Sequence, residues 1–407
     1  MKILHTSDWH VGKKLRGVSR AEEQERVLAE IVALAFAERV GLVLVAGDLF
    51  DTAAPAPEMV GLVYRTLLAL RDSGAQVVVV GGNHDNQAGL DALAPLLRAV
   101  GIAALGQVAR AGDGGFVELV TRGGEKACLA LVPFLSQRYV VKADALMDAD
   151  AAQHTATYDD RVRRIVAALT DGFRPDAVNI VVAHLMVRGG MLGGGERDAQ
   201  TIFEYCVDAA AFPGTAHYVA LGHLHRFQQV GGTLPAYYSG SPFQVDFGES
   251  EDEKGVVLVE ASPGVPAKVR FRPLTAGRRL RTLHGTLAEL AALAPSVRDD
   301  LLRVLVREPR RPGLADEVRD VLPAAVEVRI DRSSTARASA RVSGWPSVPS
   351  GARTSCSRPS WRSGATPTRG SPRCSRSCTT RRGRRRETDR ARRGGLRPVP
   401  RPHRRGL

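Results

Sequence analysis

The sequence predicts an α/β protein: a two-layer β-sandwich flanked by helices, followed by a small αβ domain and a disordered tail. Three observations lead to this fold class. Short β-branched runs alternate with helical patterns in the first part of the chain, which is typical of parallel βαβ units. Later strand-like runs are separated by Gly and Pro and are expected to be antiparallel strands that complete the second layer. The periodicity stops abruptly after residue 332.

Five short β-branched runs each carry Asp, His or Asn at or next to their ends. Residues 21–40 carry a helical pattern between the first two of them. In βαβ units ligands gather beyond the carboxyl ends of the strands, so these polar residues are expected to share one site. The five runs are KILHTSD (2–8), LVLVAGD (42–48), QVVVVGGNHD (76–85), NIVVAHL (179–185) and YVALGHLH (218–225). The runs expected to be antiparallel are LPAYYSG (234–240), GVVLVEA (255–261) and KVRFRPL (268–274).

We expect three segments in the chain. Residues 1–275 would form the main domain, residues 276–332 the small αβ domain and residues 333–407 the tail. The small domain is predicted from a repeated order of helix and strand. Its elements are a helix at 287–293, a strand at 301–308, a helix at 314–322 and a strand at 324–330.

The tail has an unusual composition. Residues 333–407 contain 20 Arg, one Asp and one Glu, a net charge of +18 within a chain total of +14, so the rest of the chain carries −4. The tail contains no Ile, Phe, Tyr or Met. It cannot bury enough apolar surface to offset the entropy of the chain, so disorder is expected. One explanation is a basic tail that binds nucleic acid. The absence of Lys and the presence of Cys356, Cys374 and Cys378 favour another, a GC-rich coding region read out of frame, which resequencing of the gene would test.

Several protein classes are excluded by composition. The chain has no run approaching about 18 apolar residues, the length needed to cross a membrane. Its N-terminus, MKILHTSDWH, lacks the basic and apolar regions of a signal peptide, so a cytoplasmic location is expected. Cys128 and Cys206 have no C-x-x-C spacing and indicate neither a disulfide framework nor a thiolate zinc site.

The strand ends supply the ligand types of a two-metal centre. Carboxylate, imidazole and amide oxygen donors suit two divalent cations of five or six coordination. Two such cations can hold both the attacking and the leaving oxygen of a displacement at phosphorus. The candidate residues are Asp8, His10, Asp48, Asp51, Asn83, His84, His184, His223 and His225.

This constellation resembles the calcineurin-like metallophosphoesterases. Their motif order, D-x-H, G-D-x-x-D, G-N-H-D or E, H and G-H-x-H, is present here in sequence. The stretches ILHTSDWHVG, VAGDLFDT, GGNHD, ALGHLH and YSGSPFQVDFGE look more narrowly like the SbcD nuclease subunits, relatives of the Mre-type DNA repair nucleases. The resemblance extends to about residue 332. Beyond it, the helical segment with which the family engages its ATPase partner is not recognisable.

The resemblance implies a role for each candidate. Asp8, His10 and His225 would hold one metal, and Asn83, His184 and His223 the other, with Asp48 bridging them. The family prefers manganese, although the ligand types would also accept iron or zinc. His84 would stabilise the charged phosphate oxygens or protonate the leaving oxygen. Asp51 would orient His84 through a carboxylate–imidazole pair.

Basic residues near these motifs are candidate contacts to DNA. They are Lys13, Lys14, Arg16 and Arg20 after the first motif, and Arg188 and Arg197 in the Gly-rich stretch after His184. Neutralising phosphates would be their role. A solvated basic loop is the alternative. The small domain resembles the capping domain of the family, which would close over DNA.

The resemblance also implies partners and an activity. The expected function is cleavage of double-stranded DNA at ends and hairpins in repair and recombination, with an SbcC-type ATPase. A homodimer is expected through the helical patterns PEMVGLVYRTLLAL and LDALAPLLRAV. Two other functions stay open. The HTSDWHVG start argues against a phosphoesterase for small molecules, and intact Asp48, Asp51 and His84 argue against a non-catalytic scaffold for DNA ends.

Overall fold

The computed structural model describes most of residues 1–331. The stretches 137–138, 142, 144–156, 197–205 and 233 lie outside the described residues, as do residues 332–407. The predictions for the tail and for Arg197 therefore fall outside the described part. Within it, no helix is long and apolar enough to span a bilayer.

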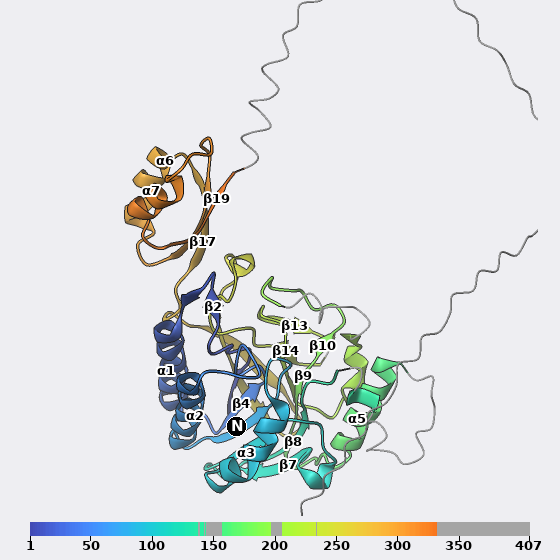
Figure 1. The fold of residues 1–407 in the computed structure, drawn as a ribbon. Helices are drawn as coiled ribbons and strands as arrows, with labels where there is room; N and C mark the ends of the chain where they lie inside the picture. The colour runs from blue at the N-terminus through green and yellow to red at the C-terminus, as the bar shows by residue number, and fades with distance from the viewer. Residues whose placement is uncertain (137–138, 142, 144–156, 197–205, 233, 332–407) are drawn as a thin grey trace, which may run out of the picture. The chain divides into compact units, whose positions relative to one another are not determined.

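Two six-stranded sheets form the main domain (Figure 1). In the first sheet β1, β4, β5 and β6 are parallel to one another. Strand β15 is antiparallel to β1, and β16 is antiparallel to β15. Its order is β16 (Val265–Pro273), β15 (Gly255–Ser262), β1 (Lys2–Thr6), β4 (Leu42–Ala46), β5 (Gln76–Val80), β6 (Ile102–Leu105). The order of the second is β13 (Gln228–Val230), β14 (Ala236–Tyr238), β12 (Tyr218–Gly222), β9 (Val178–His184), β8 (Lys126–Val132), β7 (Phe116–Val120).

One strand of the second sheet differs from the expectation. The run at 234–240 contains β14, which is antiparallel to β13 but parallel to β12. A central strand has two neighbours, and no local pattern in the chain indicates the second pairing. The shorter paired segments are β2 (Lys14–Leu15) with β3 (Val18–Ser19), and β10 (Met186–Val187) with β11 (Cys206–Val207).

Helices cover the outer faces of the two sheets. Alternate side chains of β4 show the layering: Leu42 and Leu44 pack against the second sheet, whereas Val43 and Val45 pack under helices, as the period of two requires. The helices are α1 (Ala21–Glu38), α2 (Pro57–Asp72) and α3 (Gln87–Ala99) on the first sheet, and α5 (Tyr158–Thr170) on the second (Figure 1). The architecture is thus helix, sheet, sheet, helix, as predicted.

The small domain is a three-stranded parallel sheet with two helices. Its elements are β17 (Leu280–Gly285), α6 (Leu287–Leu293), β18 (Leu301–Val306), α7 (Leu314–Val321) and β19 (Ala325–Ile330). The sequence predicted two strands and two helices here and missed β17, whose side chains include Arg, Thr and His. The small domain belongs to the same compact unit as the main domain.

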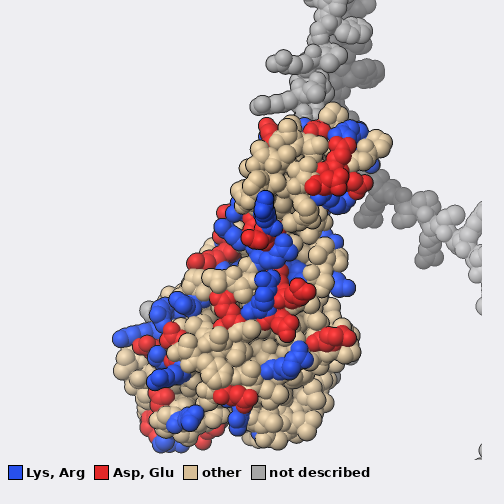
Figure 2. All heavy atoms as spheres, turned by 90° about the vertical axis from the view of Figure 1, so that its left-hand side faces the viewer, with Lys and Arg blue, Asp and Glu red and all other residues tan. Residues whose placement is uncertain are grey.

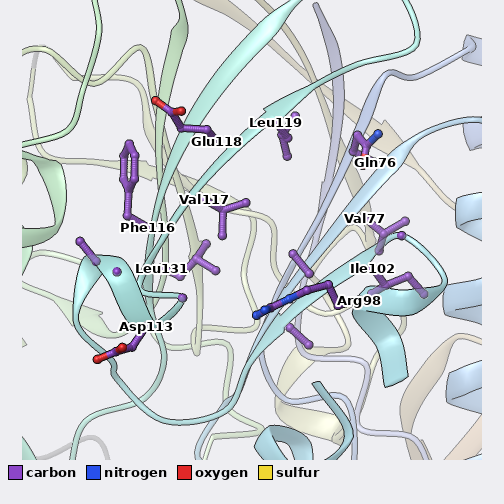
Figure 3. Close-up of a pocket in the computed structure, with 16 residues that line it drawn as sticks. Gln76, Val77, Arg98, Ile102, Asp113, Phe116, Val117, Glu118, Leu119 and Leu131 are labelled. Atoms are coloured by element: carbon purple, nitrogen blue, oxygen red, sulfur yellow. The ribbon is translucent and has the colours of Figure 1, made fainter. Parts of the chain in front are cut away.

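A pocket lies at one lateral edge of the two sheets. It has a volume of about 530 Å³ and lies between β6 and β7, the edge strands of the two sheets. Its lining includes apolar and charged side chains, among them Val77, Ile102, Val117, Leu119, Arg98 and Glu118 (Figure 3). None of the expected metal ligands lines it, so this pocket is separate from the candidate site.

Candidate metal centre

The carboxyl ends of the parallel strands place the first ligands. Asp8 and His10 follow β1, and Asp48 follows β4. The amide of Asp8 donates to Gly47 O and the amide of His10 to Asp48 O, each at 3.0 Å. The two segments after β1 and β4 are therefore bonded to each other. Their side chains contribute donor atoms to groups that could hold a metal ion.

Unusual backbone conformations aim these side chains. The φ angles of Asp8, His10 and Asp48 are 52°, 43° and 53°, and that of His223 is 104°. Positive φ in a residue with a Cβ costs on the order of 1–3 kcal/mol. Four of the expected ligands adopt such angles. The surrounding fold therefore holds their side chains in these directions although the backbone conformation is unfavourable.

Glycines in the motifs make room for the ligands. Gly47 has φ of 90°, and a Cβ there would lie 2.3 Å from His184 Nδ1. A Cβ on Gly82 would lie 2.1 Å from Asp48 Oδ1. Both distances are too short for any side chain. Gly47 thus lets the first sheet approach His184 of the second sheet, and Gly82 lets the loop after β5 approach Asp48 within the first sheet.

Asp8, His10 and His225 form the first group of donors. Their ligand atoms all lie within 4.8 Å of one another, and the Nε2 atoms of His10 and His225 are 3.0 Å apart. All three side chains are buried. This is the set expected to hold one metal.

Asn83, His184 and His223 form the second group. Asn83 Oδ1 lies 2.8 Å from His184 Nε2 and 2.9 Å from His223 Nδ1. The imidazoles of His184 and His223 lie edge to face, with ring centroids 5.2 Å apart. The three donor atoms converge, as a shared cation would require.

Asp48 lies between the two groups. Its Oδ2 is 3.8 Å from His10 Nε2 and 3.5 Å from His184 Nε2. The carboxylate is only 2% exposed. A carboxylate in this place contacts donors of both groups, which is the geometry needed for a bridging ligand.

The protonation behaviour of the site suits divalent cations. Burial, with the neighbouring His225 and His84, holds the pKa of His10 well below its usual value. Burial and the neighbouring His223 do the same to the pKa of His184. Burial raises the pKa of the Asp8 carboxyl to about 7. Neutral imidazoles are the form that binds metals, and a cation would stabilise the buried carboxylates. The residues present therefore fit a two-metal centre.

Comparison with known proteins agrees with this site. Residues 1–227 match the family described as calcineurin-like phosphoesterase. The SbcD subunit of the SbcCD nuclease from Bacillus subtilis (strain 168) is 38% identical over 284 residues, which are 69% of this chain and 71% of the relative. The chain belongs to the calcineurin-like phosphoesterase family, in its SbcD branch. This membership confirms the resemblance and the fold class predicted from the sequence.

Other SbcD relatives match over a similar length. The SbcD protein of Rhodobacter capsulatus is 35% identical over 289 residues, covering 67% of this chain and 69% of the relative. That of Escherichia coli (strain K12) is 31% identical over 314 residues, covering 74% of each. As a member of this branch the chain is a metal-dependent hydrolase.

His84 lies beside the bridging position of this SbcD-type centre. Its amide donates to Asp48 Oδ1 at 2.8 Å, and its Nε2 is 4.0 Å from Asp48 Oδ2. His10, Asp48 and His84 also lie close enough together to hold a cation. The sequence assigned His84 to the phosphate and not to a metal, and this assignment stays a prediction.

Asp51 contacts His84 through its main chain, and its expected pairing through the carboxylate stays a prediction. His84 Nδ1 bonds the backbone carbonyl oxygen of Asp51 at 2.7 Å. The Asp51 carboxylate lies 3.1 Å from Lys13 Nζ and 3.8 Å from His10 Nδ1. A carbonyl oxygen only accepts a hydrogen bond, so it fixes the proton on Nδ1 of His84 and leaves Nε2 to face the site.

The expectation that Arg20 contacts DNA was wrong. Arg20 is 3% exposed, and its guanidinium forms hydrogen bonds of 2.6 and 2.8 Å with Glu23. It precedes α1 by one residue, so its side chain folds back on the first helical turn. Arg20 is therefore a structural residue of the main domain.

The other basic candidates differ in their surroundings. Lys13 is bonded to Asp51, and Arg16 Nε bonds Glu327 Oε2 of the small domain at 2.8 Å. Lys14 and Arg188 are exposed. On the face shown in Figure 2, Lys and Arg are interspersed with Asp and Glu, without a large field of one sign. Lys14 and Arg188 are thus the candidates best placed to meet a phosphate.

Several residues that support the ligands were missed from the sequence. Asp85 accepts hydrogen bonds from the amides of Gly82, Leu49 and Phe50 at 2.9 to 3.3 Å and so joins two motif loops. Glu249 Oε1 lies 2.7 Å from His225 Nδ1. The resemblance had included YSGSPFQVDFGE, the stretch that ends in Glu249, but spacing alone assigns it no role.

Proposed function

We propose that this chain is the nuclease subunit of an SbcCD-type complex and hydrolyses DNA phosphodiester bonds with two manganese ions. The observation that carries the proposal is the buried Asp48 carboxylate between two groups of donors, with His84 beside it. Two cations held there would align the attacking and leaving oxygens and lower the pKa of a water molecule. The relatives named as nucleases support DNA as the substrate.

The residues of the chain perform the remaining tasks. His84 donates its Nδ1–H to the Asp51 carbonyl oxygen and presents Nε2 toward the phosphate. When Nε2 is protonated it stabilises charge on the phosphate oxygens or donates to the leaving oxygen. The burial of Asp8, His10 and Asp48 keeps bulk water away and strengthens their electrostatic interactions.

DNA ends and hairpins are the proposed substrates, bound by their backbones. Lys14 and Arg188 would neutralise phosphates. Replacing each by Ala is expected to lower the slope of log affinity against log salt concentration by about 0.9 for each phosphate that is no longer neutralised. Fluorescence anisotropy with a labelled duplex at several salt concentrations measures the slope. Arg20→Ala is unsuitable as a control because Arg20 is buried, and Lys268→Ala, on β16, serves instead. An unchanged slope in both variants would remove these two residues from the DNA interface.

An SbcC-type ATPase, a homodimer and a cytoplasmic location complete the proposal. The relatives are named as subunits of SbcCD, which supports the ATPase partner. Helices α2 and α3 carry exposed Leu68 and Leu96, 40% and 67% accessible, and such side chains favour a dimer through this face. Sedimentation equilibrium at micromolar concentration tests it, and a monomer mass would reject it.

The function is tested with the purified chain and three substrates. In manganese, a linear duplex and a hairpin should be cleaved, whereas a generic phosphomonoester should react slowly or not at all. A chelator should abolish cleavage. Hydrolysis of the monoester alone would leave the metal centre in place and replace the nuclease with a phosphoesterase for small substrates. Duplex binding without hydrolysis of any substrate would favour a non-catalytic scaffold.

A further inference from the structure

We propose that the buried ion pair of Glu249 and Lys254 positions His225 and thereby sets the affinity of one metal position, that of Asp8, His10 and His225. The proposal rests on the two-metal function above and assigns a task to two residues outside the metal-binding motifs. Both act through His225, so they are positioning residues.

His225 is held at three points. Its Nδ1 is 2.7 Å from Glu249 Oε1, its carbonyl oxygen accepts from Lys254 Nζ at 2.8 Å, and its amide donates to Glu196 Oε1 at 3.0 Å. The contact with Glu249 places the proton on Nδ1 and turns Nε2 toward His10. Fixing both the ring and the main chain leaves His225 little freedom to leave the ligand geometry.

Glu249 and Lys254 are paired with each other inside the protein. Lys254 Nζ is 2.8 Å from Glu249 Oε2, and the two side chains are 7% and 0% exposed, respectively. Both oxygens of the Glu249 carboxylate are thus engaged, Oε1 by His225 Nδ1 and Oε2 by Lys254 Nζ. Removing one member of such a pair leaves an uncompensated buried charge, so the pair is sensitive to substitution.

The Glu249 end of this network is anchored by its own turn. Glu249 lies in the short helix η5 (Phe247–Glu249), and Glu249 Oε2 accepts from the amide of Val245 at 3.0 Å. Gln244 Nε2 donates to the Glu249 carbonyl oxygen at 3.0 Å. Phe247 packs in an apolar cluster with Leu15 and Leu280. The carboxylate that orients His225 is thus fixed by packing, and not by its ion pair alone.

The second metal position has a different support. His184 Nδ1 is held by the carbonyl oxygen of Ala46 at 2.7 Å, and Asn83 bonds His184 and His223. The hydrogen bonds and ion pairs of Glu249 and Lys254 described above reach His225 and not these three residues. Loss of the ion pair should weaken one metal position and leave the other unchanged.

Calorimetric titration of Mn²⁺ into the metal-free full chain tests this selectivity. In Glu249→Gln and in Lys254→Met, one of two binding events should weaken by about 10- to 100-fold, the range for residues that support metal ligands. The other event should keep its affinity. Electron paramagnetic resonance should show a coupled Mn²⁺ pair in the parent protein and a single ion in the variants at the same low Mn²⁺ concentration. Higher Mn²⁺ should restore DNA cleavage.

Glu23→Gln is the matched control, because Glu23 is a buried carboxylate in an ion pair with Arg20. It should lose stability and keep both binding events. Two unchanged events in Glu249→Gln and Lys254→Met, or equal weakening of both events, would overturn the proposal. A parent protein that binds no Mn²⁺ would instead refute the metal centre on which the proposal rests. Should Glu249→Gln fail to fold, Lys254→Met gives the deciding titration.

Discussion

Asp48→Asn is expected to abolish turnover and to remove one metal's worth of binding. Asp48 is the only expected ligand assigned to both metals, and its Oδ2 faces His10 on one side and His184 on the other. Loss of several kcal/mol of charge stabilisation corresponds to a decrease in rate on the order of 10³-fold or more. Steady-state cleavage of a linear duplex and Mn²⁺ titration measure the two effects.

The Asn substitution is preferable to Ala at this position. Asp48 has φ of 53°, a conformation that Asn tolerates better than Ala. The side-chain oxygen of the Asn could still accept a hydrogen bond from the amide of His84, as Asp48 Oδ1 does in the parent. Asp91→Asn is the control, because Asp91 accepts from the amides of Gly106 and Gln107 and is not an expected ligand. Full activity of Asp48→Asn would refute the two-metal assignment.

His84→Asn is expected to abolish chemistry while both metals stay bound. The side-chain amide of Asn can donate to the Asp51 carbonyl oxygen, as His84 Nδ1 does at 2.7 Å, but it offers no proton to the leaving oxygen. A general acid contributes about 10²- to 10⁴-fold. Single-turnover cleavage should fall by this factor, and the Mn²⁺ titration should match that of the parent.

This prediction separates two roles that the structure allows for His84. His10, Asp48 and His84 are close enough to hold a cation together. If His84 is a ligand, the titration will lose affinity along with the rate, and the assignment to the phosphate will be wrong. His284→Asn is the matched control, because His284 lies in the small domain beside Asp331 and belongs to none of the motifs.

The position of the site could be predicted from the sequence because strand ends are local signals. Each β-branched run indicates a buried strand, and parallel strands have their carboxyl ends at one edge of a sheet. Asp8, Asp48 and Asn83 follow neighbouring parallel strands β1, β4 and β5. His184 and His223 lie at the ends of β9 and β12, neighbours in the other sheet. That all five strand ends share one site was expected from the position of these polar residues at strand ends, whereas the resemblance implied which residues would hold which metal.

The supporting contacts could not be predicted in this way. Asp51 is three residues from Asp48, which suggested a carboxylate partner for His84, and the structure adds a contact through the backbone carbonyl. Arg20 belongs to a basic stretch, but the start of α1 turns it inward to Glu23. Side-chain direction in each case depends on backbone geometry and on neighbours from distant segments, neither of which a residue type specifies.

The fold class, the family and the set of chemically competent residues could be inferred from the chain alone, because hydrophobic periodicity and motif order are properties of the chain. Which atoms meet depends on the folded structure. It bonded His84 to a carbonyl oxygen, buried Arg20 and brought Glu249 and Lys254 to His225. These contacts depend on which segments of the chain lie next to one another, and close packing in the folded protein fixes that arrangement.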